Sequence, residues 1–208
     1  PTILHWNGTA WSKAMGLPTI GGLNDVWGTS ATDVWAVGNN GLVVRWDGTK
    51  WSQFTISYTN GFMTVWGAAA NDMWIGGEAG LLLHWDGSKL NEVATGGIST
   101  IWRIRGSSTS NAYMTFDDGS KLSIWDGTKW TSTLDAFGVE PWVVSANKVW
   151  VVPSGGQFWF WNGLVWTRRD RRGSSVELAA FWATDNDGWL SDISGHFLHF
   201  NGTDWNPF

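Results

Sequence analysis

The stretch "DVWAVGNNGLVVRWDGTKW", residues 33–51, carries the pattern that decides the fold. Two short apolar segments flank the turn "NNG", and a second turn, "DGTK", separates Trp46 from Trp51. Asn-Gly and Asp-Gly turns are strong connectors of neighbouring antiparallel strands. The stretch therefore predicts successive antiparallel strands joined by tight turns.

The second turn recurs along the chain together with its two flanking aromatics, and we call this unit the clasp. The first aromatics of successive clasps are 36 to 40 residues apart. The six copies are WNGTAW at 6–11, WDGTKW at 46–51, WDGSKL at 85–90, WDGTKW at 125–130, WNGLVW at 161–166 and FNGTDW at 200–205. A near-constant period of about 40 residues is typical of solenoids and propellers.

More of the unit repeats upstream of the clasp. An inner aromatic precedes five of the clasps by eleven or twelve residues, and a glycine follows it by six residues. The inner aromatics are Trp35, Trp74, Tyr113, Trp150 and Trp189, and the glycines are Gly41, Gly80, Gly119, Gly156 and Gly195. A further tryptophan lies upstream of each inner aromatic. Glycine at one fixed place predicts a turn with positive φ.

The segments between these turns predict strands throughout. They are short, rich in Val, Trp, Leu, Ile and Phe, and without the 3.6-residue period of an amphipathic helix. Four antiparallel strands per unit predict an all-β chain, a β-propeller in which each unit is one four-stranded blade. We expect a single propeller domain over residues 1–208, with a half blade at 2–14 and blades at approximately 24–58, 63–97, 99–134, 139–168 and 178–208.

The half blade supplies only the last two strands of a unit. An unpaired hairpin offers an open sheet edge and invites association. Two interpretations stay open. Either the chain was cut from a longer parent at Pro1, which stands where an initiator Met is expected, or a five-bladed ring carries an extra hairpin that pairs with a partner or with itself.

Composition excludes several function classes. The 208 residues include 20 Trp, 27 Gly and no Cys, which excludes a disulfide scaffold and a cysteine-based zinc site. The net charge of −5 argues against nucleic-acid binding, which needs a basic surface. No apolar run is long enough to span a membrane. We expect no cofactor and no metal.

Residues 33–51 resemble the tectonin-type repeat of lectin propellers. That repeat has a Val-Trp-x-Val strand, a glycine turn, a strand ending in Arg-Trp, then Asp-Gly and a further Trp. The unit is also similar to Trp-rich "DVWAVG…WDGTxW" repeats of predicted bacterial surface proteins. The resemblance covers essentially the whole chain and implies a propeller that binds glycans or lipopolysaccharide, secreted or at the cell surface. Leu90, Tyr113 and Phe200 depart from it, because each replaces a Trp.

The leading hypothesis is a non-catalytic, multivalent carbohydrate-binding propeller. Each clasp supplies an aromatic pair for a sugar face and an Asp or Asn for its hydroxyls, and repeated weak sites raise avidity. The candidate residues are Trp46, Asp47, Trp51, Trp85, Asp86, Trp125, Asp126, Trp130, Trp161, Asn162 and Trp166. The alternative for these residues is structural, because a cross-strand aromatic pair stabilises a sheet by about 0.2–1 kcal/mol.

The rival hypothesis is a protein-interaction or assembly scaffold. The stretch "TRRDRRGSS" places Arg168, Arg169, Arg171 and Arg172 on one predicted linker between blades. Arginine binds carboxylate and phosphate through two parallel hydrogen bonds, so this linker is a candidate anion-binding site. The alternative is a solvated linker. A protein partner would dock on the linker face around Arg168–Arg172 or on the half blade.

No catalytic constellation is evident. Three histidines immediately precede a clasp aromatic, at a position that holds Arg, Ile or Phe in other copies, so we expect a packing position. They are His5, His84 and His199. Polar residues two positions before the inner aromatics are expected to stabilise the preceding turn. They are Asp33, Asp72, Asn111 and Asp187. We therefore do not expect an enzyme.

Overall fold

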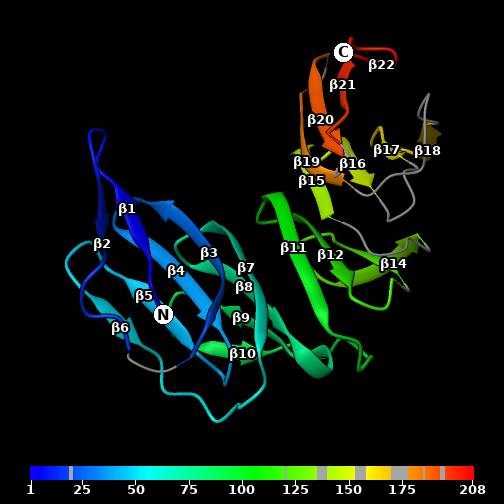
Figure 1. The fold of residues 1–208 in the computed structure, drawn as a ribbon. Helices are drawn as coiled ribbons and strands as arrows, with labels where there is room; N and C mark the ends of the chain where they lie inside the picture. The colour runs from blue at the N-terminus through cyan, green and yellow to red at the C-terminus, as the bar shows by residue number, and fades with distance from the viewer. Residues whose placement is uncertain are drawn as a thin grey trace. The chain divides into compact units, whose positions relative to one another are not determined.

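The computed structural model describes residues 1–18, 21–119, 121–134, 140–152, 158–169, 178–184, 186–192 and 195–208 (Figure 1). The chain divides into two compact units, residues 1–104 and 105–208. Within the described residues the secondary structure is strand, apart from one 3-10 turn, η1 (Glu78–Gly80).

Six antiparallel sheets follow one another along the described chain, one of two strands and five of four strands. The half blade consists of β1 (Leu4–Trp6) and β2 (Trp11–Lys13). Blade 1 consists of β3 (Leu23–Ser30), β4 (Asp33–Gly38), β5 (Val43–Trp46) and β6 (Trp51–Gln53). Blade 2 consists of β7 (Phe62–Ala69), β8 (Asp72–Gly77), β9 (Leu82–Trp85) and β10 (Leu90–Glu92).

The remaining three blades have the same order of strands. Blade 3 consists of β11 (Ile101–Ser108), β12 (Asn111–Phe116), β13 (Leu122–Trp125) and β14 (Trp130–Leu134). Blade 4 consists of β15 (Glu140–Ser145), β16 (Lys148–Val152), β17 (Phe158–Trp161) and β18 (Trp166–Arg169). Blade 5 consists of β19 (Leu178–Ala183), β20 (Gly188–Asp192), β21 (Phe197–Phe200) and β22 (Trp205–Pro207). Five full blades and a half blade were predicted from the repeat, and both are confirmed.

The strand register explains the spacing of the aromatics. In each full blade the inner aromatic on the second strand lies directly opposite the residue that precedes the clasp. These pairs are Trp35 with Arg45, Trp74 with His84, Tyr113 with Ile124, Trp150 with Phe160 and Trp189 with His199. The two clasp aromatics likewise lie opposite each other, as Trp46 and Trp51 do in blade 1.

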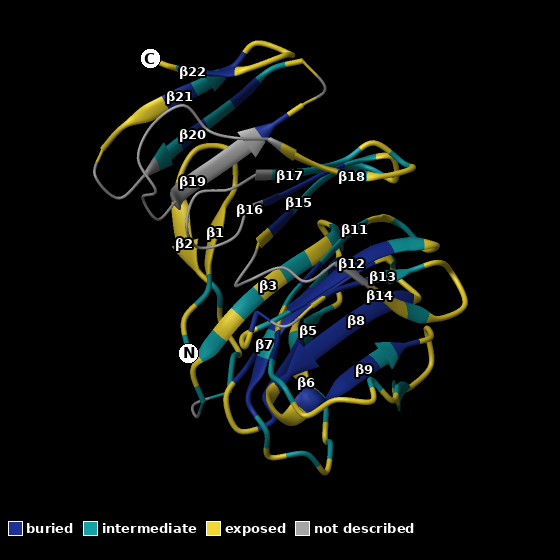
Figure 2. Ribbon diagram, turned by 90° about the vertical axis from the view of Figure 1, so that its right-hand side faces the viewer, coloured by how far each residue is buried: buried dark blue, intermediate teal, exposed yellow. Residues whose placement is uncertain are grey.

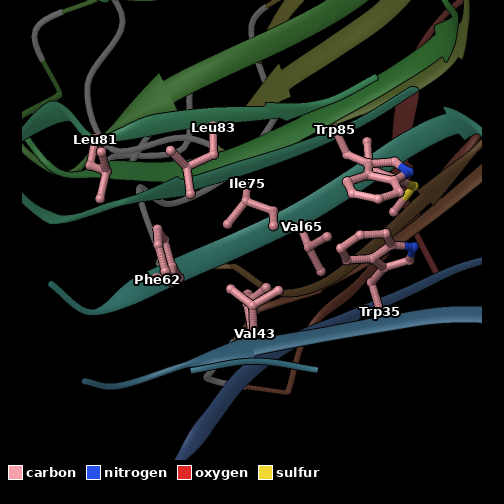
Figure 3. Packing of buried hydrophobic residues seen from close by; sticks show 10 residues of the cluster. Trp35, Val43, Phe62, Val65, Ile75, Leu81, Leu83 and Trp85 are labelled. Atoms are coloured by element: carbon pink, nitrogen blue, oxygen red, sulfur yellow. The ribbon is translucent and has the colours of Figure 1, made fainter. Parts of the chain in front are cut away.

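The core of the first unit lies between blades 1 and 2. Its buried cluster joins Trp35, Val37 and Val43 to apolar side chains of β7, β8 and β9 (Figure 3). The rings of Trp35 and Trp85 meet at a centroid distance of 5.4 Å. Burying a large apolar side chain stabilises a fold by about 1.5–3 kcal/mol. Contact with a neighbouring blade buries the middle strands on both faces, as Figure 2 shows for β8 and β9, and this is why their sequences are largely apolar.

The second unit repeats this packing. One cluster joins Tyr113 and Leu122 of blade 3 to Val149 and Val151 of blade 4. Trp159, which lies outside the repeat pattern, packs against this cluster as a core residue. A second cluster joins Trp150 of blade 4 to side chains of blade 5.

The repeated glycines adopt the predicted positive φ, at Gly41 (69°), Gly80 (70°), Gly119 (64°) and Gly195 (84°), and Gly156 lies outside the described residues. The structure adds a second reason for glycine in blades 1 and 2. A Cβ at Gly41 would lie 2.0 Å from the carbonyl oxygen of Tyr58, and one at Gly80 would lie 2.2 Å from that of Gly97. These turns therefore pack directly onto the linker that leaves the same blade.

Candidate binding surfaces

The Asp or Asn of each clasp closes the turn between the two aromatic positions. In blade 1, Asp47 Oδ1 accepts hydrogen bonds from the Thr49 hydroxyl (2.6 Å) and from the N–H groups of Thr49 (2.8 Å) and Lys50 (2.9 Å). Equivalent backbone hydrogen bonds go to Asn7, Asp86, Asp126, Asn162 and Asn201. One side-chain oxygen of each candidate sugar-binding Asp or Asn is thus already used inside the turn.

These hydrogen bonds favour the ionised carboxylates and lower their pKa values. The Thr49 hydroxyl, followed by the N–H groups of Lys50 and Thr49, lowers the pKa of Asp47 to about 2. The Thr128 hydroxyl and the following N–H groups lower the pKa of Asp126 to about 2 in the same way. The pKa of Asp86 is also lowered, first by the Ser88 hydroxyl.

The first clasp tryptophan ties its turn to the hairpin that joins the first two strands of the same blade. Its Nε1–H donates to a carbonyl oxygen of that hairpin, from Trp46 to Ala31 (3.2 Å), Trp85 to Ala70 (3.1 Å), Trp125 to Thr109 (3.0 Å) and Trp161 to Ala146 (3.2 Å). The clasp glycine packs on the same hairpin. A Cβ at Gly48, for example, would lie 2.8 Å from a Thr32 methyl group.

The structure brings the predicted clasp pairs together within each blade. Ring centroids are 5.4–5.9 Å apart in the pairs Trp46–Trp51, Trp125–Trp130 and Trp161–Trp166. Trp85 is buried, and its clasp partner is Leu90. The clasps therefore have a structural role in their blades, and sugar binding at them stays a prediction.

Sequence reasoning missed a set of side-chain pairs between the second and third strands. Asp33 Oδ1 accepts from Arg45 Nε (2.7 Å), Asp72 Oδ1 lies 2.6 Å from His84 Nε2, and Asp187 Oδ1 lies 2.7 Å from His199 Nε2. Each cationic or imidazole group also covers the inner tryptophan opposite it. His84 and His199 therefore each make a hydrogen bond to an aspartate in addition to the packing that was expected of them. An Asp twelve residues before each Arg or His was the available signal.

The arginine linker is described only at its beginning. Arg168 lies on β18 and is exposed. The side chain of Arg169, together with Arg171 and Arg172, lies outside the described residues. Anion binding at this linker stays a prediction.

The half blade presents apolar side chains to solvent. Leu4 is 57% exposed, although the equivalent positions in four blades, Val44, Leu83, Ser123 and Leu198, are 0–4% exposed. Trp6 and Trp11 are also exposed, and their rings pair at 5.6 Å. A cavity of about 300 Å³ lies at the foot of this hairpin, lined by Pro1 and residues 13–18. Among the described third strands, β1 alone has no second strand beside it.

A second depression, of about 460 Å³, lies in the first unit beside the linkers that follow blades 1 and 2. The Tyr58 hydroxyl at its wall donates to Glu92 (2.6 Å), which raises the pKa of Tyr58. Two of its polar side chains, Tyr58 and Glu92, are thus paired with each other. In the part of the chain that is described, no group of three or more His, Cys, Asp or Glu residues is placed to hold a metal ion. The same residues include no helix of the length and hydropathy needed to cross a membrane.

No model of a known protein family matches the chain, and no curated protein matches it significantly. Several solved propellers do match. The structure described as "YCF48 bound to D1 peptide" is 21% identical, with a TM-score of 0.71, and the match covers 99% of this chain and 72% of that one. Selenomethionine-substituted virginiamycin B lyase from Staphylococcus aureus is 12% identical, with a TM-score of 0.81 and coverage of 100% and 76%. The WD40 β-propeller domain of Doa1 is 13% identical, with a TM-score of 0.66 and coverage of 88% and 66%.

These similarities show that the chain has the β-propeller fold. Sequence identities this low support a shared fold and do not support a shared function. Because no family is matched, the tectonin-type lectin family stays a resemblance.

Proposed function

We propose that the chain is a protein-interaction scaffold that binds a partner polypeptide by adding its strands to the half blade. The observation that carries the proposal is the uncovered third strand β1, whose Leu4 is exposed where four of the full blades bury the equivalent side chain. Strand addition to an exposed sheet edge is a recurring mode of peptide recognition, in which backbone hydrogen bonds give affinity and side-chain pockets give specificity. Exposed apolar patches also mark interaction sites.

The named structural neighbours are compatible with this role. One of them, YCF48, is described as bound to a peptide, and another is a WD40 domain. A third is a lyase, so the fold does not decide between binding and catalysis. We infer a binding role, because the half blade is distinguished by an unpaired strand and by exposed apolar side chains.

The half blade supports protein binding better than the clasps support sugar binding. The clasp carboxylates Asp47, Asp86 and Asp126 already use an oxygen to close their turns, and Trp85 is buried. The half blade, in contrast, has an unpaired strand and uncovered side chains on one hairpin. We therefore place the scaffold hypothesis before the lectin hypothesis, and the half blade before the arginine linker.

The test is selection of a displayed library of random β-hairpins on the purified chain. Binders are expected to protect the backbone amides of Leu4 and Trp6 from hydrogen exchange, because these amides point away from β2 and would enter a new sheet ladder. Leu4→Lys should abolish binding, because it places a charge on the edge. Leu164→Lys, at a leucine that is 83% exposed in the clasp turn of blade 4, is the matched control and should bind normally. A selection that returns no binder dependent on Leu4 would contradict the proposal.

A further inference from the structure

The half blade lacks one part that all five full blades have, the hairpin formed by the first and second strands. We propose that the half blade binds a two-stranded β-hairpin whose second strand carries the motif Asp-x-aromatic, and that His5 recognises this motif. The inference rests on the proposed function and specifies the chemistry of the partner. Four features of the structure support it.

The first feature is a rule among the five complete blades. An aspartate precedes the inner aromatic by two residues only where the residue before the clasp is Arg or His. The pairs are Asp33 with Arg45, Asp72 with His84 and Asp187 with His199, at 2.6–2.7 Å. In the other two blades the residue before the clasp is Ile124 or Phe160, and the matching positions hold Asn111 and Lys148.

The second feature is His5, which occupies the same position in the half blade. It immediately precedes the clasp aromatic Trp6 and lies on β1, the third strand of this unit. Its side chain is exposed. By the rule above, a histidine here pairs with an aspartate and covers an aromatic ring on the adjacent second strand. That strand is the one absent beside β1, so the required motif is Asp-x-aromatic.

The third feature is the half-blade clasp, which packs against no hairpin of first and second strands among the described residues. In four blades the first clasp tryptophan donates its Nε1–H to the hairpin between the first two strands, as Trp46 does to Ala31. Within the described residues, no such carbonyl is available to the exposed Trp6. A Cβ at Gly8 would meet no atom within 4 Å, whereas one at Gly48 would touch Thr32 of that hairpin. The space over Gly8 therefore matches the turn of the missing hairpin.

The fourth feature is the uncovered face of β3, which points to a second strand in the partner. In blade 2, the first strand β7 is covered by blade 1, and Val65 is fully buried. The equivalent residue of blade 1, Val26, is 52% exposed. The half blade nevertheless packs on blade 1 in the manner of a neighbouring blade, because Ile3 contacts the cluster of Ala36, Leu42 and Val44. A strand that covered β3 would complete that arrangement.

The partner hairpin comes from outside residues 1–208. Every hairpin of this type that the structure describes is already paired within its own blade. A second copy of the chain would have to withdraw a hairpin from a packed blade to supply one, which would expose residues such as Trp35 and Val37 that are now fully buried. We therefore expect a segment outside residues 1–208 with the pattern of the first two strands of a blade.

The probe is a synthetic hairpin with the sequence of residues 22–39, closed by a disulfide across its open end. It contains the motif Asp33-Val34-Trp35. The closure is needed because an isolated two-stranded hairpin is only marginally stable in water. Its affinity for the 208-residue chain is measured by calorimetry, beside a peptide with Asp33→Asn. We expect the Asn peptide to bind about tenfold or more weakly, because a hydrogen bond to a charged group is lost.

Two protein variants assign that loss to His5. His5→Ile, which installs the residue found before the blade 3 clasp, should bind the Asp and Asn peptides equally. His5→Arg, which installs the residue of blade 1, should retain the preference for Asp. His84→Ile is the matched control, because it breaks the same kind of pair inside blade 2 and should leave the discrimination at the half blade unchanged.

The possible outcomes separate this inference from the proposed function. Binding of both peptides with equal affinity, lost in Leu4→Lys, would overturn the role of His5 and leave strand addition at the half blade intact. Binding of neither peptide, in a chain that still selects Leu4-dependent hairpins from a library, would overturn the Asp-x-aromatic motif alone. Failure of both experiments would overturn both. Self-association through the half blade that excludes the peptide would show a second copy as the occupant and would also overturn the inference.

Discussion

Asp33 is a buried carboxylate whose Oδ1 atom has one partner on its own strand, β4, and one on the neighbouring strand β5. Its Oδ1 accepts from Arg45 Nε and from Trp35 Nε1, at 2.7 Å and 3.1 Å. We expect Asp33→Asn to lower the free energy of unfolding by about 1.5–3 kcal/mol, because a hydrogen-bonded charge pair is broken and Arg45 is left half-buried. Urea unfolding followed by tryptophan fluorescence measures this. The double variant with Arg45→Ile should lose less than the sum of the single changes, and strict additivity would show that the two residues are not coupled.

Comparison of Gly80 with Gly96 distinguishes two reasons why a position requires glycine, a positive φ and the close approach of another backbone segment. Both have positive φ, 70° and 71°. A Cβ at Gly80 would lie 2.2 Å from the Gly97 carbonyl oxygen, whereas one at Gly96 would meet nothing within 4 Å. We expect Gly96→Ala to lower the free energy of unfolding by no more than about 1–2 kcal/mol, the cost of a left-handed backbone. Gly80→Ala should lose clearly more in the same urea titration. Equal losses of unfolding free energy in the two variants would show that the close approach of Gly97 to Gly80 does not add to the cost of the side chain.

The clasp turns differ in one ionisable group, and acid should therefore affect only some of them. Asp47 and Asp126 have pKa values lowered from 3.8 to about 2. A lowered pKa in the folded state stabilises the turn above the unfolded pKa, and this contribution is lost as the pH falls from 3.8 toward 2. Asn162 makes the same backbone hydrogen bonds without a titrating group.

We therefore expect the amide resonances of Thr49 and Lys50 to shift in NMR spectra between pH 4 and pH 2, and those of Leu164 and Val165 to stay nearly constant. The Asn turn serves as the control within the same molecule. If both turns responded alike, general acid unfolding and not protonation of Asp47 would be the cause.

At the scale of strands and turns, the repeat allowed most of the fold to be predicted. The recurring clasp and the glycine six residues after each inner aromatic placed four strands in every unit, because turn chemistry and burial act locally. The pairing of Asp72 with His84 was not predicted, because it depends on strand register, which brings together residues twelve positions apart. The close approach of the Gly80 turn to Gly97 was missed because it depends on the path of the linker that follows β10.

At the scale of the whole molecule, the sequence located the candidate site only as an incomplete copy of the repeat. The hairpin at residues 2–14 was predicted as a half blade, but its meaning depended on comparison with complete blades. Leu4 became informative only beside the buried Val44, and Gly8 only beside Gly48. A repeat protein contains its own controls, because each blade shows what the equivalent residue contacts when its surroundings are complete.

The number of partners bound per chain distinguishes the competing functions of the whole molecule. The six sheets of the described residues each have an outermost strand, and six clasps each have an Asp or Asn, so recognition of either feature would give several sites per chain. Only β1, among the described third strands, lacks its neighbouring strand. We therefore expect one Leu4-dependent hairpin to bind per chain in sedimentation and calorimetric titrations. Leu164→Lys should leave this stoichiometry unchanged. A stoichiometry of several ligands per chain, retained in Leu4→Lys and reduced by Trp51→Ala with Trp130→Ala, would instead favour the repeated clasps as the binding sites and restore the lectin hypothesis.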